Sequence, residues 1–346
     1  MFHPHLQSRG RKESLPLLLL LMLAAATGCN QPNSSSPSPA QDAALQSQQN
    51  GQPETAFQSA ASSKLKVVVT FLPMYWFTKA VVGDLAQVEV LVPPGTEVHE
   101  YQATPGNVQA IATADVLVKN GLGLEEFLET TVKNAGNSQL KEIDSSKGIE
   151  TIAPPVVKSG DTATNGTEKA GASDAHQKAG NPHIWLDPVR AKQQVANIRD
   201  GLITADPKNK TTYQANAAAY IQQLEVLDRE FKQRLQQYPK CTFVTFHDAY
   251  PYLANRYQIQ QVALVEIPED QLSPTDVQKT IAAVKQYKVK ALFGEPGVDN
   301  KLLQGLSQDL NLTLRPLDAL EFGPLDPQHY FTALKANLQN LESACR

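Results

Sequence analysis

The feature that most constrains this fold is an amphipathic pattern between Asp206-Pro207 and Pro239. Its apolar residues recur at spacings of three and four, as in a helix with one buried face. These residues are Tyr213, Ala217, Tyr220, Leu224, Leu227, Phe231 and Leu235. A helix of about 30 residues spans roughly 45 Å, which exceeds the width of one small lobe. The pattern therefore predicts a single long helix over 206–238 that joins two lobes.

Short apolar runs alternate with helical patterns on both sides of this segment. The expected strands are Leu65–Thr70, Val88–Val92, Val116–Lys119, Thr242–Phe246, Gln261–Val265, Ala291–Phe293 and a stretch near Leu312. The expected helices include Met74–Gly83, Asn107–Thr113, Leu124–Lys133, Pro274–Tyr287, Lys301–Leu310 and Pro327–Glu342. Such alternation is typical of parallel sheets. We therefore expect an α/β protein with an N-terminal lobe over 64–205 and a C-terminal lobe over 239–346.

The N-terminus carries the signals of export. Basic residues precede the apolar run Leu15–Ala26, which is too short for a permanent membrane anchor, and Thr27-Gly28-Cys29 follows. We expect a signal peptide over 1–28. Small residues before Cys29 resemble a bacterial lipobox, although Ala26 stands where leucine is usual, so lipidation of Cys29 and plain cleavage both stay open. Either route places the mature chain in the periplasm or at the outer face of the cytoplasmic membrane.

Two segments have compositions that do not support a packed core. Residues 29–63 are mostly Gln, Ser, Pro and Ala, which predicts a disordered tether. Residues 158–180 show no periodicity, and we expect them to form an exposed, mobile insertion.

The charge of the chain argues against binding to nucleic acid. The formal net charge is −4, and no basic cluster is present that could follow a phosphate backbone. We expect no nucleic-acid partner.

Three histidines follow predicted strands or lie in turn-rich loops. The chain has seven histidines, of which His3 and His5 lie in the export segment. The other five are His99, His176, His183, His247 and His329. Ligands of open α/β sheets bind beyond the carboxyl ends of strands, and His99, His183 and His247 fit that rule. Three converging imidazoles would form a metal site. The alternative is that each is a hydrogen-bonded structural residue or solvent-exposed, which is the default for His176 and His329.

Five motifs together resemble a known family. They are LVPPGTEVHEYQATP, ADVLVKNGLGLEEFLE, NPHIWLDP, FHDAY and FGEPGVDNK. In this order they resemble the ABC-transporter solute-binding proteins that capture zinc or manganese, particularly the zinc-uptake members, from about Leu65 to the C-terminus. The resemblance implies two lobes with parallel four-stranded sheets, joined by one rigid helix, with the metal in the cleft between them. It also implies a monomeric receptor, not an enzyme, that delivers Zn²⁺ to the permease and ATPase of an importer.

The resemblance also implies a set of metal ligands. The family's first-lobe ligands match His99 and His183. Its third ligand matches His247, which is histidine in zinc-type members and commonly glutamate in manganese-type members. The fourth position is a carboxylate, matched best by Asp318, or a water. Three neutral nitrogens with one carboxylate or water suit tetrahedral Zn²⁺ better than Mn²⁺.

Acidic residues beside the histidines are candidates for supporting roles. Glu97 and Glu100 flank His99, and Asp248 follows His247. Each could orient an imidazole or attract a cation. The alternative is that they are solvated charges. Glu295 resembles a family-typical residue near the cleft, and the sequence assigns it no role.

The insertion departs from the pattern of the family. Zinc-type members often carry a long histidine-rich and acidic loop there, whereas 158–180 contains a single histidine, His176. A second metal site in this segment is therefore not expected.

Two cysteines lie in the predicted C-terminal lobe. Cys241 precedes the strand of His247, and Cys345 ends the last predicted helix. Two thiols in an exported protein favour a disulfide, which would pin the last helix to the lobe. The alternative is that both are free and buried.

Other functions are compatible with parts of the sequence. A manganese receptor would use the same architecture. A zinc hydrolase would also use three histidines and an open position, but the sequence has no His-Glu-x-x-His helix and no Gly-x-Ser-x-Gly elbow. A surface adhesin would be a third possibility, and no adhesive repeat is present.

Overall fold

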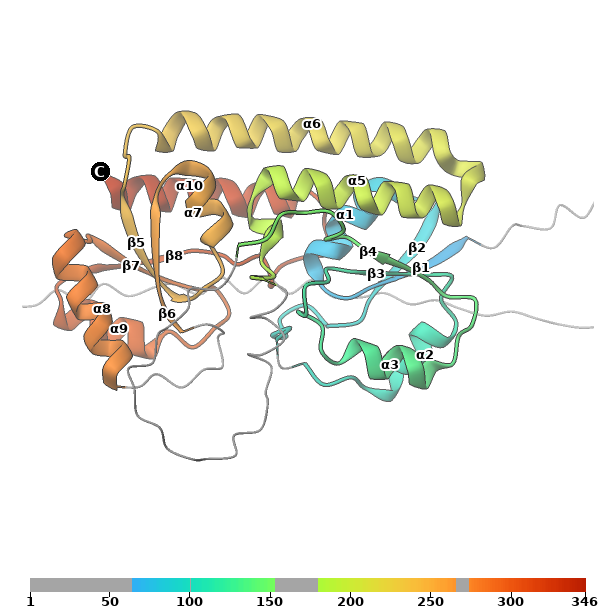
Figure 1. Ribbon diagram of the computed structural model, residues 1–346, viewed down its shortest axis with the longest axis horizontal. Coiled ribbons are helices and arrows are strands. Elements are labelled where there is room, and N and C mark those ends of the chain that lie inside the picture. The colour runs from blue at the N-terminus through green and yellow to red at the C-terminus, as the bar shows by residue number, and fades with distance from the viewer. Residues whose placement is uncertain (1–63, 100, 153–179, 266–273) are drawn as a thin grey trace, which may run out of the picture. The chain divides into compact units, whose positions relative to one another are not determined.

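Two parallel four-stranded sheets form the framework of the computed structural model, which describes residues 64–99, 101–152, 180–265 and 274–346 (Figure 1). The first sheet has the order β2-β1-β3-β4 and the second has the matching order β6-β5-β7-β8. The strands are β1 (Leu65–Val69), β2 (Ala86–Val90), β3 (Val116–Lys119), β4 (Lys141–Asp144), β5 (Thr242–His247), β6 (Gln260–Val265), β7 (Ala291–Gly294) and β8 (Thr313–Pro316). The predicted α/β fold with two lobes is confirmed. The predicted lobe boundaries stay predictions.

Several predicted features lie outside the described residues. They are the signal peptide, Cys29 and the tether before residue 64, together with Glu100 and His176. All but the last residue of the predicted insertion over 158–180 lies outside as well.

Helices cover both faces of each sheet (Figure 1). One side carries α1 (Leu72–Val82), α5 (Pro188–Ala205), α6 (Lys210–Leu235), α7 (Pro251–Tyr257) and α10 (His329–Cys345). The other side carries α2 (Pro105–Ala112) and α3 (Leu128–Ala135) on the first sheet, and α8 (Pro274–Tyr287) and α9 (Lys301–Asp309) on the second. Two short 3-10 turns, η1 (Ile184–Leu186) and η2 (Pro207–Asn209), precede α5 and α6. Helix α5 and strand β4 were not anticipated from the sequence.

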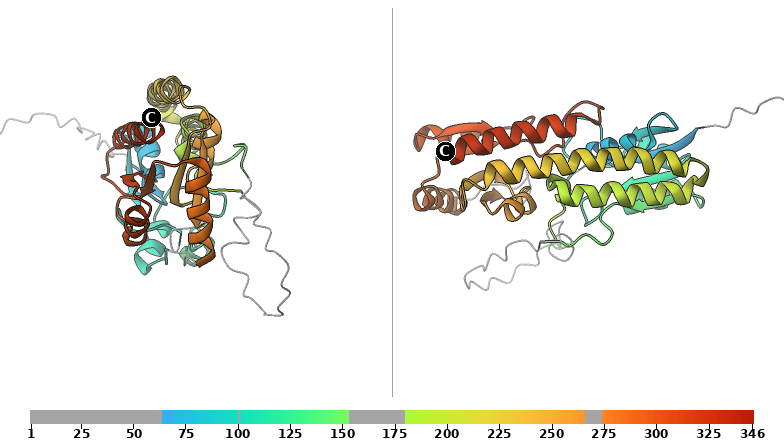
Figure 2. Two further views of the ribbon diagram at one scale, coloured as in Figure 1. Left: turned by 90° about the vertical axis from the view of Figure 1, so that its left-hand side faces the viewer. Right: turned by 90° about the horizontal axis from the view of Figure 1, so that it is seen from above.

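Helix α6 is the long helix that the apolar spacing predicts. It has 26 residues and buries the seven apolar positions named above, from Tyr213 to Leu235. It packs against α1 and α5 of the first lobe and against α10 and α7 of the second. The right-hand panel of Figure 2 shows α6 lying beside α5 and α10. One helix therefore contributes to the packing of both lobes.

The strands divide their side chains between separate cores because successive residues point to opposite faces. In β1, Val67 and Val69 enter the largest core cluster, whereas Val68 enters a cluster beneath the first sheet. In β5, Phe243 joins the same largest cluster and Val244 joins a cluster beneath the second sheet. The largest cluster therefore runs continuously from one sheet to the other along α6. Burial of both sheet faces explains why β1 and β3 carry continuous apolar runs instead of alternating apolar and polar residues.

The disulfide predicted as one of two alternatives is present. Cys241 and Cys345 are joined, which links the residue before β5 to the last residue of α10 across a sequence separation of 104. The last helix is thus attached covalently to the second lobe.

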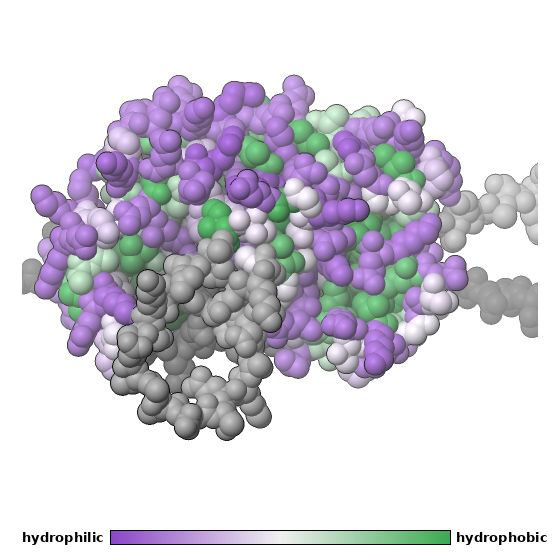
Figure 3. Space-filling view, in the orientation of Figure 1, coloured by the Kyte–Doolittle hydropathy of each residue, from purple (hydrophilic) through white to green (hydrophobic). Residues whose placement is uncertain are grey.

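The visible surface is mainly hydrophilic, with scattered hydrophobic residues (Figure 3). Among the described residues, the exposed large hydrophobic side chains are Val226, Tyr287, Leu302 and Leu325. Isolated exposed hydrophobics are ordinary on a protein surface. Within the same part of the chain, no helix is long and apolar enough to cross a membrane.

Candidate metal centre

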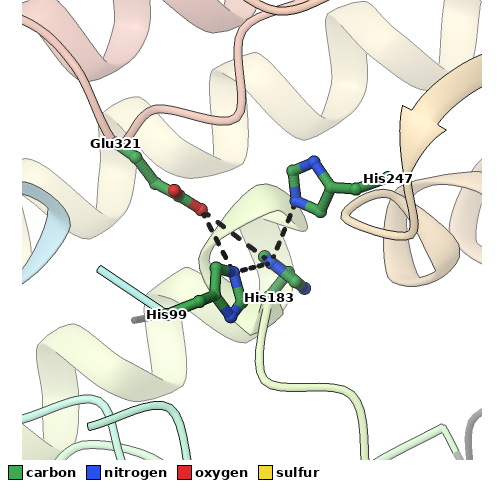
Figure 4. A group of neighbouring side chains, drawn as sticks. All are labelled: His99, His183, His247 and Glu321. Carbon is green, nitrogen blue, oxygen red and sulfur yellow. Dashed lines mark hydrogen bonds and ion pairs between the residues drawn. The ribbon is translucent and has the colours of Figure 1, made fainter. Parts of the chain in front are cut away.

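Four buried side chains converge between the two lobes (Figure 4). They are His99, His183, His247 and Glu321, with exposed fractions of 6%, 1%, 0% and 4%. One ligand atom from each lies within 4.8 Å of the others. The Nε2 atom of His183 lies 3.2 Å from that of His99 and 3.3 Å from that of His247. Glu321 Oε1 lies 3.9 Å from His99 Nε2 and 3.8 Å from His183 Nε2.

Each lobe supplies two of these groups. His99 lies in the loop after β2, and His183 immediately precedes η1. His247 is the last residue of β5, and Glu321 lies in the loop between β8 and α10. Ligands of open α/β sheets bind beyond the carboxyl ends of the strands. His99 follows β2 of the first sheet and His247 ends β5 of the second, so each sheet supplies a histidine from the carboxyl end of one strand.

The spacing of the nitrogens fits a tetrahedral cation. Four ligands at about 2.0–2.1 Å from Zn²⁺ lie roughly 3.3–3.4 Å apart at the corners of a tetrahedron. The two spacings between Nε2 atoms, 3.2 and 3.3 Å, match this edge. The carboxylate spacings of 3.8 and 3.9 Å are somewhat longer, and a small shift of the Glu321 side chain would close them.

Asn181 fixes the orientation and the tautomer of His183. Its Oδ1 accepts a hydrogen bond from the His183 backbone N–H at 3.0 Å and lies 2.9 Å from the ring Nδ1. Because an amide oxygen can only accept hydrogen bonds, Nδ1 carries the ring proton. The Nε2 atom therefore presents its lone pair to the other histidines. Asn181 is held in turn by the second lobe, since its Nδ2 donates to Asp248 O at 2.7 Å.

Glu295 has the corresponding role for His247. The buried Glu295 carboxylate, immediately after β7, accepts a hydrogen bond from His247 Nδ1. The Asn300 side chain binds both the backbone N–H and the carbonyl of Glu295, which fixes the turn that carries it. A carboxylate behind a metal-binding imidazole orients the ring and raises its basicity. Glu295, to which the sequence alone assigned no role, therefore orients the His247 imidazole.

The pKa of the His247 imidazole reflects opposing effects. Burial lowers this pKa, but the charge and hydrogen bond of Glu295, with smaller contributions from Glu97 and Asp248, raise it. The net result is a pKa above the ordinary value for histidine. The negative potential around this ring favours any cation bound there, whether a proton or a metal ion.

The structure corrects the choice of Asp318, which was predicted for the fourth position with a water as the alternative, because the carboxylate in the converging group is that of Glu321. Asp318 is not part of the group, because its Oδ1 accepts a hydrogen bond from the backbone N–H of Leu320 at 2.7 Å. Its backbone is bound on both sides by the Asn337 side chain. Asp318 therefore shapes the loop, and Glu321, three residues later, carries the carboxylate that reaches the histidines.

Three other candidate residues, Glu97, Asp248 and His329, lie near the four converging side chains or apart from them. Glu97 is half-buried, and its Oε1 accepts a hydrogen bond from the backbone N–H of Val98, next to His99. The carbonyl of Asp248 supports Asn181, so this residue acts on the site through its backbone. His329 begins α10, where its ring lies 5.3 Å from that of Trp76, and it is outside the group.

Replacing Glu295 tests the supporting role of its carboxylate. Glu295→Gln keeps a group that can accept from His247 Nδ1 but removes the charge, so we expect metal affinity to fall by about 10-fold. Isothermal titration with Zn²⁺ measures the change. The matched control is Glu225→Gln on the exposed face of α6, where the carboxylate pairs with Lys192 at 2.7 Å. An equal loss in both variants would contradict a local role for Glu295.

A family profile and individual relatives match most of the chain. The profile described as the periplasmic component A of the zinc-uptake complex, ZnuA, matches residues 67–344. A zinc-binding lipoprotein, AdcA, of Streptococcus pneumoniae serotype 4 is 33% identical over 294 residues, which cover 82% of this chain. The chain spans only 56% of the length of that relative. The high-affinity zinc uptake system protein ZnuA of Bacillus subtilis is 30% identical, with 81% of this chain and 88% of the relative covered.

Solved structures have the same architecture. The Zn(II)-bound ZnuA-like domain of Streptococcus pneumoniae AdcA superposes with a TM-score of 0.66 and 30% identity. The match covers 81% of this chain and 98% of that domain. The likeness therefore extends over both sheets and the residues between them.

Proposed function

This chain belongs to the ZnuA family of periplasmic zinc-uptake components, and we propose on that premise that it is a Zn²⁺ receptor. It captures the ion outside the cytoplasm and delivers it to an ABC-type permease driven by its ATPase. The receptor works as a monomer, either free in the periplasm or attached to the membrane through lipidated Cys29. The ion is bound by His99, His183, His247 and Glu321, as cargo to be transported.

One observation carries this proposal. Asn181 and Glu295 each hold the Nδ1 proton of a histidine, so the Nε2 atoms of His183 and His247 both present lone pairs. These two atoms face each other at 3.3 Å, where no hydrogen bond between them is possible without an added proton. Two lone pairs at this distance repel each other, and a cation between them removes the repulsion. The arrangement is suited to a metal ion.

The donor set favours zinc over manganese. Three imidazole nitrogens and one carboxylate are typical of tetrahedral Zn²⁺, whereas Mn²⁺ prefers more oxygen ligands. The third histidine, His247, decides the balance because an oxygen ligand at its position would favour manganese.

The burial of the fourth group supports capture over catalysis. A catalytic zinc site keeps a coordination position open for water and substrate. In the proposed site Glu321 fills that position from within the protein, which its exposed fraction of 4% supports. A substrate would have to displace a buried carboxylate, which disfavours a zinc hydrolase.

Titration of chelator-stripped protein tests the function. We expect one equivalent of Zn²⁺ to bind tightly, Mn²⁺ to compete poorly, and the loaded protein to hydrolyse no ester, peptide or phosphoester. Turnover of any of these substrates, or a preference for Mn²⁺, would contradict the receptor.

Proton competition predicts a pH dependence of zinc affinity. Zn²⁺ binds neutral imidazole, so protonation of a ligand opposes binding. The pKa of His247 lies above its ordinary value, and the proton is bound below that raised pKa. Affinity should therefore be independent of pH well above it and should fall as the solution is acidified, starting above about pH 6.5. Chelator competition between pH 5 and 9 measures the profile, and a flat profile down to pH 5 would contradict histidine ligation.

A further inference from the structure

The loop between β8 and α10, residues 317–328, carries Glu321 and is held by aromatic donors from other elements. Asn337 of α10 donates to Asp318 O at 2.7 Å, and four aromatic side chains donate hydrogen bonds to other backbone carbonyls of the loop. They are Trp185 Nε1 to Ala319 O at 2.8 Å, Trp76 Nε1 to Pro324 O at 2.8 Å, Tyr250 Oη to Leu317 O at 2.8 Å, and Tyr220 Oη to Pro327 O at 3.1 Å. The loop is therefore fixed along its length by groups outside it.

The two aromatic donors nearest Glu321 along the loop are the only tryptophans of the chain. Trp185 binds the carbonyl two residues before Glu321, and Trp76 binds the carbonyl three residues after it. Both indoles are fully buried. Trp76 lies on α1 and Trp185 in η1, so both belong to the lobe that carries His99 and His183. The loop itself follows β8 of the other lobe.

The backbone of the loop is shaped to accept these contacts. Gly323 has a φ of +147°, and a Cβ added there would lie 2.6 Å from His329 Nε2 and 3.3 Å from Trp76 Cζ2. A side chain at this position would therefore collide with His329 and crowd Trp76, so the loop would have to shift. On the other side of Glu321, Leu320 has a φ of +66°, and its N–H is bound by Asp318. Such a loop has few other conformations in which the carboxylate reaches the histidines.

We propose that Trp76 and Trp185 are positioning residues of the metal site, acting through Glu321. Their indole N–H groups fasten the Glu321 loop to the lobe of His99 and His183, so these three ligands are held in one frame. His247 is then the one ligand of the four whose position is set by the second sheet alone. This inference rests on the proposed zinc-binding function.

A double-mutant cycle separates positioning from a general structural effect. Zinc affinity is measured by chelator competition for Trp185→Phe and Trp76→Phe, each in the native background and with Glu321→Gln. Phenylalanine keeps an aromatic ring but removes the N–H donor. We expect each tryptophan variant to weaken binding by about 10-fold in the native background. When Glu321→Gln is already present, adding either tryptophan substitution should lower the zinc affinity by less than about 2-fold.

A spectroscopic readout and a matched control complete the test. The visible spectrum of bound Co²⁺ reports the ligand set, and the spectrum of each tryptophan variant should move towards that of Glu321→Gln. The control is Tyr213→Phe, which removes a buried donor to Asp206 Oδ2 at the start of α6. It should lower the melting temperature without changing zinc affinity.

Several results would overturn the inference. One is an equal loss of affinity in both backgrounds, and another is an unchanged affinity in the tryptophan variants while Glu321→Gln alone weakens binding. An unchanged affinity in Glu321→Gln would also overturn it, without affecting the zinc receptor itself, which is tested by titration of the native chain. If Trp185→Phe does not fold, Trp76→Phe and Gly323→Ala carry the same comparison.

Discussion

His247→Ala is expected to weaken Zn²⁺ binding by more than about 100-fold, the upper end of the loss seen when a residue that only supports a ligand is removed. The substitution deletes one of three nitrogen donors and leaves Glu295 as a buried carboxylate without its imidazole partner. Two histidines and one carboxylate then hold the ion with an open position. Competition with a calibrated zinc chelator at pH 7.5 measures the change.

The matched control for this prediction is His329→Ala. His329 is also a histidine of the C-terminal half of the chain. Its ring packs against Trp76, and it does not belong to the metal-binding group. Its loss should change zinc affinity by only a few-fold. Similar losses in the two variants would contradict the assignment of His247 as a ligand.

Removing the disulfide is expected to lower the free energy of unfolding by about 2–5 kcal/mol. Cys241 and Cys345 close a loop of about a hundred residues, and an open loop of this length raises the entropy of the unfolded chain. Zinc affinity should change little, because Cys241 precedes β5 and His247 ends it, about 20 Å further along the strand. Urea denaturation of the metal-free Cys345→Ala variant measures the free energy of unfolding, and chelator competition measures its zinc affinity.

The double variant with both cysteines replaced provides the control for the disulfide. Because the two residues act through one bond, the double variant should be about as stable as either single variant. Reduction of the native protein should reproduce the loss. Additive losses, or a loss of zinc affinity that matches the loss of stability, would contradict a purely structural role.

The sequence predicts those parts of the fold whose signal is long or repeated. The buried face of α6 is an example, because seven apolar positions at spacings of three and four are compatible only with an amphipathic helix. The central strands β1, β3 and β5 were also predictable, since they are apolar runs bounded by turns. Strand β4 and helix α5 were not predicted, because their apolar residues follow a strand or helix period less clearly. β4 is the short edge strand Lys141–Asp144, with one buried residue of four, so its sequence lacks the apolar run of a central strand.

Helix α5 had a detectable signal. Asp187 caps it by accepting a hydrogen bond from the N–H of Val189, and Pro188 occupies its first turn. Its buried residues are Pro188, Ala191, Gln194, Val195, Ile198 and Leu202. The spacing of the last four apolar positions follows the helical period, but the buried Gln194 interrupts the apolar face.

The site was predictable in its histidines and not in its carboxylates. Imidazoles are rare in this chain, so their placement after strands is informative. Carboxylates are common, and Asp318 and Glu321 lie only three residues apart in the same loop. The choice between them depends on the turn that Leu320 makes and on the hydrogen bonds of Asp318 to that turn, which are tertiary features. The role of Glu295 likewise depends on β7 lying beside β5 in the sheet.

Diffraction from crystals of the zinc-loaded protein at the zinc absorption edge locates the bound ion relative to the four proposed ligands. We expect one anomalous peak, about 2.0–2.2 Å from the Nε2 atoms of His99, His183 and His247 and from a carboxylate oxygen of Glu321. A peak elsewhere in the molecule, or a zinc ion that any of the three imidazoles does not contact, would contradict the account.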